Sequence, residues 1–88
     1  MTARRVTVVN GLGLHARAAA KFVKLAGTFG SQIRVTRGQR TVDGKSILGL
    51  LLLAAARGSH IDIAAEGPDE GEAVTALAGL VERGFEEA

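Results

Sequence analysis

A histidine and an arginine stand two residues apart in the run Gly13-Leu14-His15-Ala16-Arg17, directly before a stretch of strong helix formers. The unpaired N–H groups and the dipole at the start of a helix favour a bound anion and disfavour an imidazolium. A neutral His15 imidazole is a nucleophile, and a phosphoryl group on it would meet compensating positive charge. Arg17 adds a planar guanidinium that suits phosphate oxygens. These residues predict a phosphate-handling site.

Ser46 is a second candidate, because it precedes the apolar run over residues 47–53. A serine there fits the N-cap of a short helix, and a hydroxyl at a helix start also suits regulatory phosphorylation. The run makes this helix apolar nearly all round, whereas a short helix on a sheet needs only one apolar stripe. Two alternatives stay open for its leucines: burial in the core, or a docking patch for partner proteins.

Two glycine-containing stretches resemble nucleotide-binding motifs, but neither satisfies the full pattern. Residues 11–16 match the dinucleotide fingerprint G-x-G-x-x-A, yet Arg34 and Arg37 stand where the acidic ribose ligand is expected, and 88 residues cannot supply two nucleotide-binding halves. Five residues separate Gly38 from Gly44-Lys45-Ser46, where a P-loop has four. His60 has no acidic or thiol partners nearby, so we expect it to be structural or to face solvent.

Composition narrows the classes of function further. The 88 residues, 47% of them hydrophobic, fit one compact domain over 1–88. The chain has no cysteine and two isolated histidines, so a metal site is not expected. A net charge of +2 without Tyr or Trp argues against nucleic-acid binding. The apolar run 47–56 is about half the length that spans a bilayer, and no signal peptide is apparent. We therefore expect a cytoplasmic protein that does not insert into membranes.

The elements that must position these residues follow from hydrophobic periodicity and turn residues. A hairpin turn is expected at Gly38-Gln39, and one buried face is expected on the last helix. The order is βαββαβα, which predicts an α+β domain with three helices on one face of a four-stranded antiparallel sheet. Strands are expected over residues 3–9, 32–37, 40–43 and 60–66, and helices over 16–27, 46–56 and 69–85.

The chain resembles the HPr family, the histidine-containing phosphocarrier proteins of the bacterial phosphotransferase system. The resemblance extends over nearly the whole chain and predicts the HPr-like open-faced sandwich. It rests on four segments: Gly13-Leu14-His15-Ala16-Arg17, Ala19-Ala20-Lys21-Phe22-Val23, Lys45-Ser46-Ile47-Leu48-Gly49 and Ile63-Ala64-Ala65-Glu66-Gly67-Pro68-Asp69-Glu70.

The resemblance implies that Nδ1 of His15 accepts a phosphoryl group from enzyme I, which phosphoenolpyruvate has charged, and passes it to an enzyme IIA. Arg17 would stabilise the phosphohistidine, and Ser46 matches a regulatory serine modified in some lineages by an HPr kinase/phosphorylase. We expect a monomer that is itself the phosphorylated intermediate, without a cofactor or metal. The expected partner contacts are Ala16, Ala20, Lys24, Ile47, Leu48 and Leu51.

One position departs from the pattern of many sugar-system members, which have proline after the arginine. Here Ala18 stands there, and either residue suits a first helical turn. Ala18, together with residues 10–13 and 66–70, looks more like the nitrogen-related branch, often called NPr, whose phosphate would end on a regulatory enzyme IIA. The alternative from another class is a non-catalytic regulatory binding protein controlled by phosphorylation of Ser46.

Overall fold

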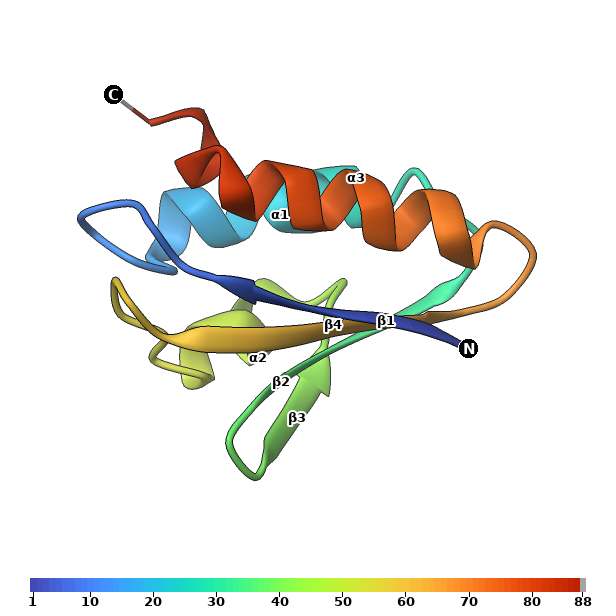
Figure 1. Cartoon of the computed structure of the whole chain (residues 1–88), viewed down its shortest axis with the longest axis horizontal. Coiled ribbons are helices and arrows are strands. Elements are labelled where there is room, and N and C mark those ends of the chain that lie inside the picture. Colours follow the sequence, from blue (N-terminus) through green and yellow to red (C-terminus); the bar gives the residue numbers. More distant parts are fainter. Residues whose placement is uncertain (88) are drawn as a thin grey trace.

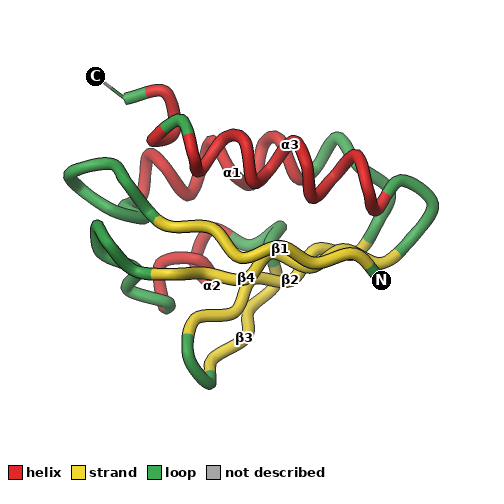
Figure 2. The backbone as a smooth tube through the Cα atoms, viewed as in Figure 1, coloured by secondary structure: helices red, strands yellow, loops and turns green. Residues whose placement is uncertain are grey.

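The computed structural model describes residues 1–87, and its elements follow the expected βαββαβα order before a final 3₁₀ turn (Figures 1 and 2). Their bounds are β1 Thr2–Thr7, α1 Ala16–Ala26, β2 Gln32–Arg37, β3 Arg40–Asp43, α2 Ile47–Leu52, β4 His60–Glu66, α3 Glu70–Glu82 and η1 Gly84–Glu86.

The four strands form one antiparallel sheet in the order β1-β4-β2-β3. The long helices α1 and α3 lie side by side over the sheet, while the short α2 packs against α1 and β3 (Figure 1). The hairpin between β2 and β3 turns at Gly38, whose φ of 61° favours glycine. The predicted α+β class, with three helices and a four-stranded antiparallel open sheet, is confirmed.

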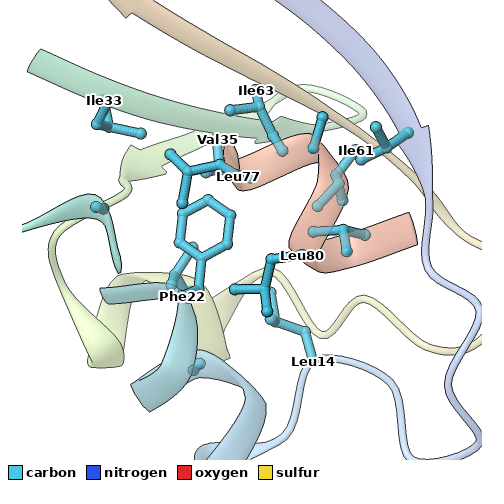
Figure 3. Close-up of a cluster of buried hydrophobic side chains, with 14 of the residues drawn as sticks. Leu14, Phe22, Ile33, Val35, Ile61, Ile63, Leu77 and Leu80 are labelled. Atoms are coloured by element: carbon cyan, nitrogen blue, oxygen red, sulfur yellow. The ribbon is translucent and has the colours of Figure 1, made fainter. Parts of the chain in front are cut away.

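The core lies between the helices and the covered face of the sheet. Phe22 of α1 lies close to Leu77 of α3 and Val35 of β2, and Leu14 lies near Leu80 (Figure 3). Alternate residues of β4 are buried, as expected for a strand with one covered face. The apolar residues expected on one face of the last helix are all buried: Ala73, Leu77, Leu80 and Val81.

Three elements end two or more residues before the position that the sequence predicts. The first strand ends at Thr7 instead of residue 9, and α3 ends at Glu82, before the separate turn η1. The middle helix ends at Leu52 instead of residue 56, because the chain takes a left-handed φ of 49° at Ala54. The backbone carbonyls after Leu52 accept hydrogen bonds from outside the helix. Arg37 donates to the carbonyl of Leu53, and the N–H of Leu14 donates to the carbonyl of Ala55.

Asp69, at the start of α3, fastens the loop before β2. Its carboxylate accepts hydrogen bonds from the N–H groups of Gly30 and Ser31, at 2.9 Å each, and from the Ser31 hydroxyl. These bonds, led by the one from the Ser31 side chain, lower the pKa of Asp69 below its usual value. The charged carboxylate is thus the form that the folded loop requires.

We predict that this contribution to stability is lost in acid. Since the folded pKa lies below the unfolded value of about 3.9, the contribution is complete at neutral pH and disappears as the pH falls through the folded pKa. Asp69→Asn should be less stable than the parent at pH 7, and this difference should shrink below about pH 4. Urea unfolding across this range measures it, with Glu72→Gln in the same first turn as the control. An undiminished difference in acid would contradict the assignment.

Among residues 1–87, no helix is both long and apolar enough to cross a membrane.

Candidate functional site

The loop between β1 and α1 is fixed in place before it reaches His15. Gly13 has a φ of 66°, and a Cβ there would lie 2.6 Å from the carbonyl oxygen of Ala55, so only glycine fits. The next residue, Leu14, is buried and donates its N–H to the same carbonyl at 2.9 Å. The helix that follows therefore begins at a defined place beside the 55–59 segment.

His15 is the N-cap of α1, as the sequence predicts. Its backbone is extended, and its Nδ1 accepts the N–H of Arg17 at 3.3 Å. That N–H belongs to the first turn, where amides lack partners within the helix. The Nδ1 lone pair therefore points toward the positive end of the α1 dipole, where a phosphoryl group would be stabilised.

The other ring nitrogen of His15 contacts a residue from the far end of the chain. Nε2 lies 2.7 Å from a carboxylate oxygen of Glu87, and Nε of Arg17 lies 3.7 Å from the same oxygen. The second oxygen of Glu87 accepts a hydrogen bond of 2.7 Å from the buried side-chain amide of Asn10. The same amide nitrogen also binds the carbonyl of Gly13 at 2.7 Å, so Asn10 links Glu87 to the loop.

The C-terminal turn brings Glu87 to this place. Phe85 is fully buried with a left-handed φ of 57°, which redirects the chain after α3. Lys21 of α1 donates a hydrogen bond of 2.8 Å to the Phe85 carbonyl. In Figure 1 the turn after α3 lies at the same end of the molecule as the loop before α1. The turn is thus held by its own buried ring and by α1.

Glu87 is ionised in this setting. Its side chain is 15% exposed, and the hydrogen bond from Asn10, followed by the contact with His15, lowers its pKa. Beside Glu87 an open depression of about 770 Å³ has Arg17, Lys21, Arg57 and Arg83 in its lining. Glu82 also lines it, so the depression next to the site carries four basic side chains and two carboxylates, those of Glu82 and Glu87.

Ser46 is the N-cap of α2, as the sequence predicts. Its hydroxyl accepts the N–H of Gly49 at 3.0 Å. Of the two alternatives that the sequence leaves open for its apolar residues, burial in the core and exposure on the surface, both occur in this helix. Leu50 is fully buried, whereas Leu48 is 68% exposed. The other exposed apolar residues of this helix are Ile47, Leu51 and Leu52.

The contact between α1 and α2 brings the two candidate regions onto neighbouring helices. Ala16, Ala20 and Lys24 are exposed at four-residue spacing along α1, as expected for one face of a helix. His60 is exposed on β4, with its Nδ1 3.0 Å from the Thr7 hydroxyl. The prediction that His60 is structural or faces solvent is confirmed.

Two residues that the structure places at the site, Glu87 and Asn10, are not predicted from the sequence. Glu87 follows His15 by 72 positions, in a short acidic tail with no periodicity. Asn10 lies in a loop, and only its residue type carries a signal: an amide between the buried residues Val8 and Leu14 needs hydrogen-bond partners. Within residues 1–87, no cluster of three or more potential metal ligands is present.

Comparisons with known proteins agree with this geometry. A family model described as "PTS HPr component phosphorylation site" matches residues 2–83. The phosphocarrier protein HPr of Cupriavidus necator is 49% identical over 99% of this chain and 98% of its own. The phosphocarrier protein NPr of Shewanella violacea is 41% identical over 97% and 93%. A crystal structure of HPr from Thermoanaerobacter tengcongensis superposes with a TM-score of 0.96 at 42% identity, covering 100% and 99% of the two chains.

Proposed function

Because the chain belongs to the HPr family of phosphocarrier proteins, we propose that it carries a phosphoryl group on Nδ1 of His15. The observation that carries this proposal is the orientation of the ring. Nε2 is occupied by Glu87, while the Nδ1 lone pair faces the start of α1, where an anion is favoured. The group would come from enzyme I charged by phosphoenolpyruvate and would leave to an enzyme IIA.

Arg17 is placed to assist this transfer. Its side chain is 72% exposed, and its contact with Glu87 at 3.7 Å is long for an ion pair, so the guanidinium can turn toward a phosphoryl group. A guanidinium can bind two phosphate oxygens at once, which suits both the phosphohistidine and the group in transit.

We predict that Arg17→Ala slows phosphoryl transfer without abolishing acceptance. A charge-assisted hydrogen bond is worth about 1.5–3 kcal/mol, so the rate should fall roughly 10- to 100-fold. The fold should be unaffected, because the Arg17 side chain is largely exposed and its 3.7 Å contact with Glu87 is long for an ion pair. Stopped reactions with purified enzyme I measure the rate, and Arg34→Ala, on the sheet, is the matched control. A parental rate in the Arg17 variant would remove Arg17 from the mechanism.

The destination we propose is the nitrogen-related branch, in which a regulatory enzyme IIA receives the phosphate. The proposal rests on Ala18, which is fully buried in the first turn of α1 where many sugar-system members have proline. Purified phosphorylated protein, offered equal amounts of a nitrogen-type and a sugar-type enzyme IIA, should phosphorylate the nitrogen-type enzyme faster. Faster transfer to the sugar-type enzyme would place the protein in the transport branch.

Partner proteins would contact α1 and α2 around His15. Ala16, Ala20 and Lys24 on α1, with Ile47, Leu48 and Leu51 on α2, are the exposed residues we assign to this surface. Phosphorylation of Ser46 by an HPr kinase/phosphorylase would add control of docking, since Ser46 immediately precedes the exposed Ile47. We propose that the protein acts in the cytoplasm as a monomer, where enzyme I and enzyme IIA meet it.

A further inference from the structure

We propose that Glu87, held by Asn10, is a positioning residue that keeps the proton of His15 on Nε2 and so directs phosphorylation to Nδ1. The inference deepens the proposed function and rests on it for its kinetic consequence. Its structural part concerns the isolated protein and stands on contacts between three elements: the loop before α1, the N-cap of α1 and the turn after α3.

The hydrogen-bond pattern fixes which nitrogen carries the proton. A carboxylate only accepts hydrogen bonds, so the 2.7 Å contact between Glu87 and Nε2 requires the proton to be on Nε2. The N–H of Arg17 only donates, so the 3.3 Å contact requires an unprotonated Nδ1. Both contacts favour the same tautomer, and they leave a single nucleophilic nitrogen.

Asn10 holds the carboxylate of Glu87 in a fixed position. Its amide nitrogen donates to both Glu87 and the carbonyl of Gly13, at 2.7 Å each, and its side chain is buried. The Phe85 ring and the bond from Lys21 to the Phe85 carbonyl hold the backbone two residues before Glu87. The carboxylate is thus anchored through its side chain and through its main chain.

The carboxylate also compensates charge during transfer. The Nδ1 lone pair forms the new N–P bond as the bond between phosphorus and the donor breaks, and the donor atom keeps that electron pair. The proton on Nε2 stays in place, so the ring becomes positive as the phosphoryl group arrives. The Glu87 carboxylate, 2.7 Å from Nε2, stabilises this developing positive charge without having to move.

Chemical phosphorylation tests the structural part without any partner protein. Potassium phosphoramidate, a small phosphoryl donor, should modify His15 of the parental protein at Nδ1 only, because Glu87 covers Nε2. Glu87→Ala should yield a mixture of Nδ1 and Nε2 products, distinguished by ³¹P and ¹⁵N NMR. Glu87→Gln retains an acceptor oxygen and should preserve Nδ1 selectivity. Glu86→Ala, which removes the neighbouring exposed carboxylate, is the control.

Enzyme I kinetics test the catalytic part. Glu87→Ala should lower kcat about 10- to 100-fold with little change in KM, and Glu87→Gln should lose most of the same factor because it lacks the charge. In a protein that already lacks Glu87, the further substitution Asn10→Ala should lower kcat little more, because Asn10 acts through Glu87. Nδ1-only product and a parental kcat in Glu87→Ala would overturn the inference. Failure of enzyme I to phosphorylate even the parent would refute the proposed function, while the phosphoramidate products would still decide the role of Glu87.

Discussion

Replacing His15 with alanine is expected to abolish phosphoryl acceptance while leaving the protein folded. The ring is the only nucleophile among residues 1–87 that is aligned with the start of α1 in this way. The protein should stay folded, because loss of the N-cap contact costs about 1 kcal/mol and Glu87, which also loses its contact with His15, keeps the hydrogen bond from Asn10. The buried residues beneath it, Leu14 and Ala18, are untouched by the change.

The experiment compares label from phosphoenolpyruvate and enzyme I in the His15→Ala and parental proteins, together with their thermal unfolding. His60→Ala is the matched control, since it removes the chain's other histidine from the exposed side of β4. The control should accept phosphate at the parental rate. Label retained in His15→Ala would move the phosphorylated residue elsewhere.

Leu48→Glu should block docking of enzyme I while the protein stays folded. Leu48 is 68% exposed on α2, so in the free protein the new carboxylate lies in water. In a complex that covers this helix it would be buried without a partner, which costs several kcal/mol. We expect phosphorylation of His15 by enzyme I to slow by at least about 100-fold, mainly through KM.

Ser46→Asp tests the same surface with a smaller expected effect than Leu48→Glu. The carboxylate can accept N–H groups at the start of α2 as the serine hydroxyl does, so stability should be retained. Its single charge beside Ile47 and Leu48 should slow phosphorylation by enzyme I less than Leu48→Glu does. Ala3→Glu adds the same charge on the edge strand β1 and should leave the rate unchanged. Parental rates in both α2 variants would show that this helix is not the contact surface.

The local parts of this site can be predicted from sequence, and the long-range parts cannot. The glycine, histidine and arginine of residues 13–17 lie within one loop and one helical turn, so their types and spacing carry the signal. Ser46 is likewise predictable as an N-cap because the apolar run begins directly after it. Glu87 reaches His15 only because Phe85 is buried in a left-handed turn, and no local pattern encodes that arrangement.

The end of the middle helix, α2, likewise cannot be predicted from the local sequence. The leucine and alanine residues over 47–56 have high helix propensity, which favours a helix through the whole run. Tertiary contacts end it earlier, since Arg40 and Arg37 bind the carbonyls of Leu52 and Leu53. These bonds satisfy groups that a longer helix would use internally. Propensity therefore locates the helix but cannot predict where it ends.

The most direct test of the account is to identify the phosphorylated atom. Protein labelled with ¹⁵N in its histidines is incubated with enzyme I and phosphoenolpyruvate, and ³¹P and ¹⁵N NMR spectra are recorded. We predict an acid-labile phosphoramidate whose phosphorus couples to Nδ1 of His15. An acid-stable phosphate ester, coupling to Nε2, or no phosphorylation by active enzyme I would contradict the account.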